Sequence, residues 1–450
     1  MPDSPATVEK FGIEHIPEDS RHGAPNRTFT LWFAANLTVA DYIIGVLTTA
    51  SFGMSVAQAI PVLLLGNLLG GLFLGLSAAM GPRLGFPQMF SSRASFGRRG
   101  NYALGAFNWV STVGWFTVNT ILGVEAVQAV APTANYALVA LVLVALQVVI
   151  AVYGHDFIQV FERVMSAVLG VLFLVIFLLT VPHFAQVFGV SAASGGGAGS
   201  GGLAALGTSA IVFAISFSYL MSWSPYASDY SRYLSPSTSA RKVALYALAG
   251  GAAASFGVEL IGALVGSINA VPTIGGLYAF AGQFGWVAML AIVLGGMAAN
   301  ALNIYTNALS ALVLDIKARR ATMVVAGGVV GLGLAILAGA SFESFFENFL
   351  LALDYWITPW LAIVLVDFYL RKRTTVESSQ RAPGFDFGAL GVYAFSIIVS
   401  VPFMVPPSPL PSPVGALASW FGGADFSYFV SFALAAVLTL ALRRRSGAAG

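Results

Sequence analysis

The residue pattern best suited to chemistry lies inside the apolar stretch 107–119, whose sequence is FNWVSTVGWFTVN. On a helix, residues at positions i, i+4, i+7 and i+11 share one face. The residues on that face are Asn108, Thr112, Trp115 and Asn119, with Ser111 at its edge. Buried amides need partners, and a flat indole ring beside them suits a small planar polar ligand. The same face suits hydrogen-bonded packing between helices, so the stripe alone leaves both interpretations open.

A second row of amides lies in the stretch GGMAANALNIYTNALS. Asn300, Asn303 and Asn307 follow two glycines and are spaced to lie on one face of a helix. One or two amides suffice to hold membrane helices together. Three on one face therefore indicate contact with a ligand or an ion.

Two apolar segments carry central polar residues that predict a break in the helix. The first, LWFAANLTVADYIIG, contains Asn36, Thr38 and Asp41 within one and a half turns. In the second, FAISFSYLMSWSPYASDYSRYL, Pro225 cannot continue the hydrogen-bond ladder. The polar and aromatic residues that crowd its middle are Ser216, Ser218, Tyr219, Ser222 and Trp223. Transporters use such breaks to expose backbone groups to a substrate or an ion at the middle of the membrane.

Ionisable residues inside the apolar segments are candidates for coupling to an ion. A carboxylate in a membrane is costly, so Asp41 is the first candidate for a proton or cation site, and Glu259 is the second. A solvated aspartate in a water-filled vestibule is the alternative for Asp41. Asp229 and Arg232 are three residues apart and can pair, either in an inner gate or on the surface. The surface ion pair is the simpler interpretation.

The sequence gives no sign of a metal centre or an enzyme. The chain has no cysteine, and its histidines show no metal-ligand spacing, being scattered at His15, His22, His155 and His183. His-Glu-x-x-His motifs, nucleophile elbows and paired catalytic carboxylates do not occur. We therefore expect no metal and no cofactor.

The composition indicates an all-α polytopic membrane protein. Of the 450 residues, 58% are hydrophobic and 9% are charged, whereas a soluble domain carries about 25% charged residues. Long unbroken apolar runs favour helices over barrel strands. Twelve runs are long enough to span a bilayer, at 29–54, 58–80, 102–130, 135–153, 162–182, 206–228, 241–269, 284–312, 321–340, 344–370, 388–406 and 426–442.

The basic residues predict the orientation. All 21 Lys and Arg residues lie in the tails or in connections that follow even-numbered segments. By the positive-inside rule, these connections and both termini face the cytoplasm, in a plasma or inner membrane. The predicted parts are a cytoplasmic tail at 1–27, a five-helix unit at 28–182, an extracellular Gly-rich loop at 183–205, a second five-helix unit at 206–370, and two further helices with a cytoplasmic tail at 371–450.

The order of these features predicts an internal repeat. The broken segments are the first and the sixth, and the amide rows lie on the third and the eighth. Each pair is five segments apart, and because five is odd the two halves would have opposite orientations. This pattern is typical of secondary transporters with inverted repeats and a site at the repeat interface.

Five motifs along the chain are GFPQMFSSRASFGRRGNY, GWFTVN, PYASDYSRY, AANALNIYTNALS and FENFLLALDYWITPWLAIVLVDFYLRKR. They resemble the nucleobase:cation symporter family 1, and most of all its purine–cytosine permease branch. The resemblance covers essentially the whole chain from Asn26 onward. It implies the LeuT-type fold of 5+5 inverted repeats plus two C-terminal helices, and uptake of a nucleobase or a related ring compound with a cation.

The resemblance also implies roles for single residues. Trp115 would be an aromatic platform, with Asn119 and Asn108 as polar contacts on the same helix. Tyr219 or Trp223 would be the second platform. The neighbouring contacts, amide positions and unwound segment that match the family are Ser218, Asn300, Asn303, Asn36, Leu37 and Thr38.

One departure from the family bears on the ion. Sodium-coupled relatives place hydroxyl side chains just before the first amide of the eighth helix, where this chain has Ala298 and Ala299. Methyl groups supply no ligand to Na⁺, so the departure favours H⁺, carried by Asp41 or, less favourably, by Glu259.

The sequence thus predicts a proton-coupled importer of cytosine or purines that works by alternating access, with no nucleic-acid partner. The nearest alternatives are another ring compound, such as a hydantoin, allantoin, thiamine, uracil or a pyridoxine-like molecule, and coupling to Na⁺. A channel is disfavoured because the acidic residues are isolated rather than arranged in rings. The oligomeric state is left open.

Overall fold

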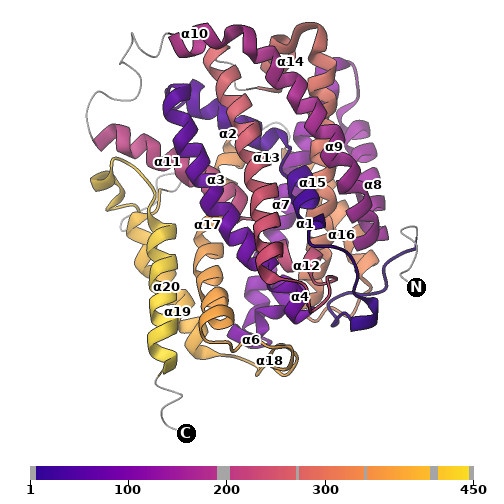
Figure 1. The fold of residues 1–450 in the computed structure, drawn as a ribbon, viewed down its shortest axis with the longest axis vertical. Helices are drawn as coiled ribbons and strands as arrows, with labels where there is room; N and C mark the ends of the chain where they lie inside the picture. Colours follow the sequence, from indigo (N-terminus) through magenta and orange to yellow (C-terminus); the bar gives the residue numbers. More distant parts are fainter. Residues whose placement is uncertain (1–6, 190–202, 270–272, 339–341, 406–413, 445–450) are drawn as a thin grey trace.

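The computed structural model describes residues 7–189, 203–269, 273–338, 342–405 and 414–444. Within these ranges the chain consists of helices and connecting loops. The long helices run roughly along one direction in a tall bundle (Figure 1). The predicted linker at 191–202 and the Pro-rich segment 406–413 lie outside the described residues.

The helices of the first half are α1 (Arg27–Ala35), α2 (Val39–Ala50), α3 (Val56–Ala78), α4 (Gly81–Leu84), α5 (Gln88–Ser91), α6 (Arg93–Phe96), α7 (Asn101–Val130), α8 (Tyr136–Tyr153), α9 (His155–Thr180) and α10 (Phe184–Gly189). Those of the second half are α11 (Leu203–Met221), α12 (Ala227–Ser231), α13 (Ala240–Ile268), α14 (Ile274–Ala281), α15 (Gly285–Val313), α16 (Arg320–Ala338), α17 (Phe342–Leu365), α18 (Val376–Gln380), α19 (Phe387–Ser400) and α20 (Ser427–Arg444). Every one of the twelve predicted segments falls on one of these helices or on a helix pair.

Eight helices of the described chain are long and apolar enough to cross a membrane, and α1 with α2 forms a ninth, bent span. Three shorter apolar helices lie at Tyr355–Leu370, Phe387–Phe403 and Ser427–Ala441. The prediction of a polytopic helical protein is therefore confirmed, whereas twelve spans and a 5+5 repeat stay predictions.

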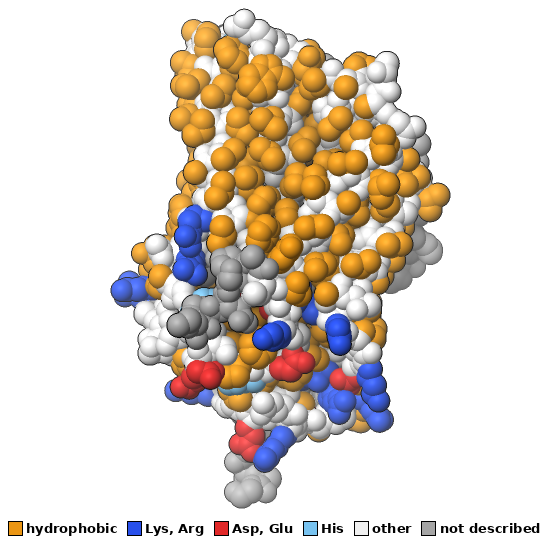
Figure 2. Space-filling view, turned by 90° about the vertical axis from the view of Figure 1, so that its right-hand side faces the viewer, with side chains coloured by type: hydrophobic (Ala, Val, Ile, Leu, Met, Phe, Trp, Pro, Cys, Tyr) orange, Lys and Arg blue, Asp and Glu red, His pale blue; other side chains and the backbone are white. Residues whose placement is uncertain are grey.

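The surface has an apolar belt above a charged end. Hydrophobic side chains cover most of the face shown in Figure 2, and the charged side chains gather below them. Leu138 on α8, Leu174 on α9 and Leu337 on α16 are among the exposed apolar residues. A belt of this kind is the surface that lipid would cover. We call the end that carries α4, α6, α12 and α18 the charged end (Figure 1).

The first predicted break is confirmed. Helix α1 ends at Ala35, α2 begins at Val39, and the two helices are bent by 57°. Thr38 between them is extended, with φ −124° and ψ 160°, and its hydroxyl caps α2. Across the break, a Cβ added to Gly295 of α15 would lie 2.2 Å from the carbonyl oxygen of Leu37. The glycine is therefore what lets α15 touch the unwound backbone.

The second predicted break is milder. Pro225 lies in a 3₁₀ turn, Ser224–Tyr226, that joins α11 to α12. Together they form one apolar span of 26 residues. The proline therefore tightens the helix locally without producing the sharp bend of the first segment.

Helices α7 and α15 are tied together at the charged end. Asp315 follows α15 and accepts hydrogen bonds from Arg93 and Arg98, at 3.0 and 2.8 Å, and from Tyr102 of α7. Burial acts to raise the pKa of Asp315, but the hydrogen bonds from Arg98 and Tyr102 outweigh it and lower that pKa to about 2. The carboxylate stays ionised at neutral pH and holds the two helices in register.

Candidate functional site

The two amide rows meet where α7 packs against α15. Asn119 of α7 and Asn303 of α15 both donate to the side-chain oxygen of Asn300, at 3.2 and 3.1 Å. The side-chain nitrogen of Asn300 donates to the carbonyl oxygen of Phe116 at 2.9 Å and to Gln147 of α8 at 3.2 Å. Asn300 thus joins three helices. Asn300 therefore holds helices together at the point where the two amide rows meet.

Asn119 and Asn303 each keep an unused acceptor. Both side chains are buried, at 4% and 1% exposure, and their side-chain oxygens have no hydrogen-bond partner among the described residues. A buried acceptor without a donor is costly, typically by about 1–3 kcal/mol. The two oxygens are therefore suited to accept hydrogen bonds from a ligand.

An aromatic pair lies beside these amides. Trp115 stands one helical turn before Asn119, and its ring contacts Tyr219 of α11 edge to face, with centroids 5.3 Å apart. Trp223 instead donates from its indole nitrogen to the side-chain oxygen of Asn36 at 2.9 Å and packs on Trp32. Of the two aromatic candidates on the sixth segment, Tyr219 is the one that lies against Trp115.

The aromatic pair is linked to Asp41 through Thr38. The hydroxyl of Thr38 donates to one carboxylate oxygen of Asp41 at 3.1 Å and lies 2.8 Å from the hydroxyl of Tyr219. A threonine hydroxyl has one proton, so when it donates to Asp41 it accepts from Tyr219. The other oxygen of Asp41 is buried and has no partner among the described residues. The break therefore brings the ring of Tyr219 and a buried acid into one hydrogen-bonded chain.

Glu259 forms a second buried acidic centre on α13. One carboxylate oxygen accepts from Asn67 of α3 at 2.5 Å and from Ser216 of α11 at 2.9 Å. A Cβ added to Gly45 would lie 1.9 Å from the backbone oxygen of Glu259, so α2, which carries Asp41, touches α13 directly. Both acids have hydroxyl and amide partners rather than cations among their described hydrogen bonds. Such an acid is suited to take up a proton or a cation.

Three other predicted contacts lie around this centre at different depths. Ser218 is buried on α11, adjacent to Tyr219. Asn36 accepts from Ser255 at 3.3 Å as well as from Trp223. Asn108 donates to Ser310 at 2.8 Å, and it precedes Asn119 by 11 residues. At 1.5 Å per residue, this places the two amides roughly 16 Å apart along α7. Asn108 precedes Trp115 by seven residues, or roughly 10 Å along α7, so it lies farther from Trp115 along the helix than Asn119 does.

The surface location expected for an ion pair of Asp229 and Arg232 was wrong, whereas their role in an inner gate stays a prediction. Both side chains are buried, at 2% and 0% exposure. Asp229 accepts from the backbone nitrogen of Gln88 at 2.8 Å and from Thr306 at 2.7 Å. Arg232 donates to the carbonyl oxygen of Gly12 at 2.7 Å and to the hydroxyl of Tyr305 at 3.1 Å. Each residue therefore joins its helix to a different neighbour.

The partner of Arg232 that sequence reasoning missed is Glu9. Its carboxylate lies 3.4 Å from Arg232 and 3.4 Å from Arg320, at the start of α16. It also accepts from the hydroxyls of Tyr305, at 2.9 Å, and Tyr233. The segment before α1 is thus bonded to α12, α15 and α16 at the charged end. No motif marks Glu9, because its partners are hundreds of residues away in the sequence.

Sequence reasoning also missed Asn67, although the position of this residue in the sequence could have identified it. It is an amide at the centre of the apolar, glycine-rich segment 58–80. Amides at that depth need partners. The same argument that singled out Asn300 therefore applies to Asn67.

Comparisons with known proteins bear on this arrangement. The family model for permeases of cytosine and purines, uracil, thiamine and allantoin matches residues 15–431. A putative purine-cytosine permease of Bacillus subtilis is 28% identical over 97% of this chain and 96% of its own. A purine-cytosine permease of Emericella nidulans is 27% identical over 97% of this chain and 88% of its own.

A solved structure shares the fold. Mhp1, a nucleobase-cation-symport-1 family transporter in a closed conformation with bromovinylhydantoin bound, superposes with a TM-score of 0.78. It is 20% identical and covers 98% of this chain and 95% of its own. The fold and the match over residues 15–431 agree with the resemblance of the five motifs. The chain belongs to the family of permeases for cytosine, purines and related compounds.

Proposed function

We propose that this protein imports a nucleobase, cytosine or a purine, together with a cation by alternating access. The observation that carries the proposal is the junction of α2, α7, α11 and α15. There the edge-to-face pair of Trp115 and Tyr219 adjoins the unused amide oxygens of Asn119 and Asn303 and the buried acid Asp41. A planar ring, hydrogen-bond acceptors and an ion carrier are the three parts that such a transporter needs.

The rings of Trp115 and Tyr219 are nearly perpendicular, at 87°, so a planar base can stack on only one of them. In this proposal the base stacks on Trp115, with Tyr219 beside it, while Asn119 and Asn303 read its edge. Nucleobases carry N–H donors on the ring edge, and the two amide oxygens lack donors among the described residues. Stacking contributes about 1–3 kcal/mol per base and is nearly indifferent to its identity. Discrimination between bases therefore comes from the amides, because leaving a buried polar group unpaired penalises the wrong base.

The coupled cation is H⁺ in this proposal, with Asp41 as its carrier and Glu259 as the second acid. Ala298 and Ala299 offer methyl groups where a bound Na⁺ would need oxygen ligands, and both are buried. Thr38 bonds Asp41 to Tyr219, so a change in the charge of Asp41 alters a group that touches the substrate platform. Loading of the proton and loading of the base are thereby coupled.

For the arrangement in the membrane, we propose the same repeats and the same orientation that the sequence predicts. Residues 28–182 and 206–370 would be the two inverted five-helix repeats, with α19 and α20 outside them. Both termini and the charged end would face the cytoplasm of a plasma or inner membrane. The apolar belt and the gathering of Lys and Arg at one end support this orientation.

Uptake of labelled cytosine tests the proposal in cells that lack their own permease. The assay compares sodium-free buffer with the same buffer after sodium is restored, each with and without a protonophore, and uses unlabelled adenine, hypoxanthine, uracil and allantoin as competitors. Saturable uptake that the protonophore abolishes is the expected result. Uptake that requires Na⁺ would contradict proton coupling. Absence of cytosine and purine uptake in both buffers would contradict the substrate class, and the competitors would then be tested as substrates.

A further inference from the structure

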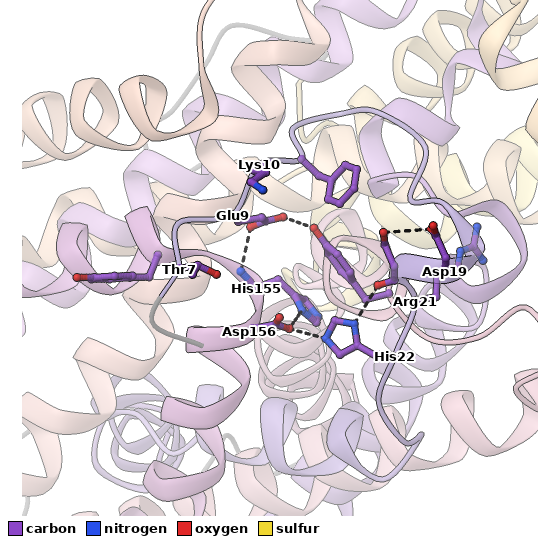
Figure 3. A pocket seen from close by; sticks show the side chains of 12 residues that line it. Thr7, Glu9, Lys10, Asp19, Arg21, His22, His155 and Asp156 are labelled. Carbon is purple, nitrogen blue, oxygen red and sulfur yellow. Dashed lines mark hydrogen bonds and ion pairs between the residues drawn. The ribbon is translucent and has the colours of Figure 1, made fainter. Parts of the chain in front are cut away.

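Three side chains that commonly bind transition metals converge at the charged end, away from the candidate site. They are His22, in the segment before α1, and His155 and Asp156, the first two residues of α9 (Figure 3). One carboxylate oxygen of Asp156 lies 2.6 Å from Nε2 of His22 and 3.0 Å from Nδ1 of His155. The three ligand atoms all lie within 4.8 Å of one another. Because His22 and Asp156 are 134 residues apart, the fold creates this cluster.

The ring nitrogens that face away from Asp156 show which nitrogen of each histidine is free to bind an ion. Nδ1 of His22 lies 3.0 Å from the carbonyl oxygen of Ser20, and Nε2 of His155 lies 3.0 Å from that of Tyr230. A carbonyl oxygen only accepts, so both of these nitrogens carry hydrogen. In a neutral ring the opposite nitrogen then presents a lone pair, and both lone pairs point at Asp156. Lone pairs from three atoms require a cation between them, which is either a proton on each ring or one metal ion.

We propose that His22, His155 and Asp156 form a binding site for a divalent transition metal of the zinc class. Two imidazoles and one carboxylate are a common ligand set for such ions, and a backbone carbonyl behind each imidazole is the usual second layer. Imidazole ligands favour Zn²⁺, Co²⁺ or Ni²⁺ over Mg²⁺ or Ca²⁺. The site therefore selects a class of ion that is distinct from the coupled cation.

The dimensions suit this class of ion. Bonds of about 2.0–2.1 Å in a tetrahedron place neighbouring ligand atoms roughly 3.3 Å apart. The present contacts of 2.6 and 3.0 Å would widen by about 0.7 and 0.3 Å to reach this spacing, and the two imidazole nitrogens, which lie within 4.8 Å of each other, would take up the same spacing. His22 and Asp156 are partly exposed, at 26% and 30%, and border a cavity of about 220 Å³. Solvent can thus supply the fourth ligand.

The ion would fasten the segment before α1 to α9. The same segment is held at Glu9, which contacts Arg232 and Arg320 and accepts a hydrogen bond from the backbone nitrogen of His155 at 2.9 Å. A metal bond at His22 would add a second point of attachment. Metal binding should consequently stabilise the folded protein, because the unfolded chain does not hold the three ligands together.

Cobalt titration of the purified full-length protein tests the site. The protein is stripped with a chelator and purified with a tag that contains no histidine. We expect the visible absorption of four-coordinate Co²⁺ to saturate at one equivalent per chain, to be displaced by Zn²⁺, and to be accompanied by a Zn²⁺-dependent rise in Tm. His22→Gln and Asp156→Asn should each raise the Kd for Co²⁺ by more than about 100-fold, since even outer-layer changes cost 10- to 100-fold.

His15→Gln is the matched control. His15 lies in the same segment but contacts Arg21 and Phe86. The Kd of the His15→Gln variant for Co²⁺ should therefore equal that of the wild type. Melting in the presence of the chelator shows whether each variant is folded. Weak or non-saturating Co²⁺ binding, or equal binding by His22→Gln and wild type, would overturn the proposal and leave a cluster that holds protons only. Neither readout depends on transport, so the result is independent of the proposed function.

Discussion

At the scale of single residues, the site divides into side chains that are fully bonded and side chains that are not. Asn300 uses both its oxygen and its nitrogen within the protein, whereas Asn119, Asn303 and Asp41 each keep an unused oxygen. Replacing the first kind of residue should disturb packing. Replacing the second kind should alter what the protein binds.

We predict different effects for the aromatic platform and for the amide. Trp115→Ala should weaken every substrate by a similar factor, because stacking of about 1–3 kcal/mol corresponds to roughly 5- to 150-fold in Kd. Asn303→Ala should instead change the ranking of substrates, because it removes one unused acceptor. Competition by a panel of bases measures both. Equal ranking in the two variants would show that Asn303 takes no part in discrimination.

We predict that Asp41→Asn separates binding from coupling. An amide keeps the shape of the side chain and its contact with Thr38, but it cannot carry a charge. Exchange of labelled for unlabelled substrate across the membrane should persist, while accumulation driven by the proton gradient should be lost. Asp19→Asn, at an exposed position, is the control. Full accumulation by Asp41→Asn would remove Asp41 from the coupling mechanism.

Residue types and spacing revealed part of this site. The spacing of polar residues in a helix identifies the face on which they lie, but not which of them lie beside the ligand. Asn108 and Asn119 share a face of α7 although they lie far apart along it. The pairing of Trp115 with Tyr219 rather than Trp223 depends on how α11 packs, which one sequence leaves open. Glu9 and the cluster at His22 depend on contacts across the whole chain, and local pattern carries no trace of them.

At the scale of helices, the break between α1 and α2 and the glycine that faces it are the main features. The sequence predicted the break from Asn36, Thr38 and Asp41, because three polar residues cannot continue cheaply through an apolar helix. The milder turn at Pro225 shows that a proline near the end of a span need not bend it sharply. The bend angle of a broken helix depends on its tertiary contacts with neighbouring helices.

We predict that Gly295→Ala impairs transport far more than a comparable change elsewhere. The added Cβ would lie 2.2 Å from the carbonyl oxygen of Leu37, so α15 must move away from the break. Gly257→Ala on α13 is the control, because a Cβ there meets no atom within 4 Å. Uptake rates normalised to the amount of protein in the membrane measure the effect. Equal rates would show that α15 can withdraw without cost.

At the scale of the whole molecule, the segment before α1 closes the charged end. Glu9 joins it to α12, α15 and α16, which are remote from one another in sequence. The composition predicted the helical class, and the distribution of basic residues matched the gathering of charge in Figure 2. Composition alone, however, does not reveal that Arg232 and Arg320 are buried against the carboxylate of Glu9.

We predict that Glu9→Gln destabilises the protein. It leaves Arg232 and Arg320 buried near a neutral amide, and breaking a buried ion pair by removing one partner costs roughly 3–5 kcal/mol. Thermal unfolding in detergent measures the loss, with Glu18→Gln at an exposed position as the control. Equal Tm values for the two variants would show that the guanidinium groups find other partners or water.

The break in the first span has an electrical consequence. Where a helix stops, its unbonded carbonyl groups leave a partial negative charge, and where one starts, its unbonded amides leave a partial positive charge, each near half an elementary charge. At residues 36–38 the end of α1 and the start of α2 lie within three residues of each other, so the protein carries a local dipole there without any ionised group. A ring compound that donates from one edge and accepts at the other would be turned by this field before it touches a side chain.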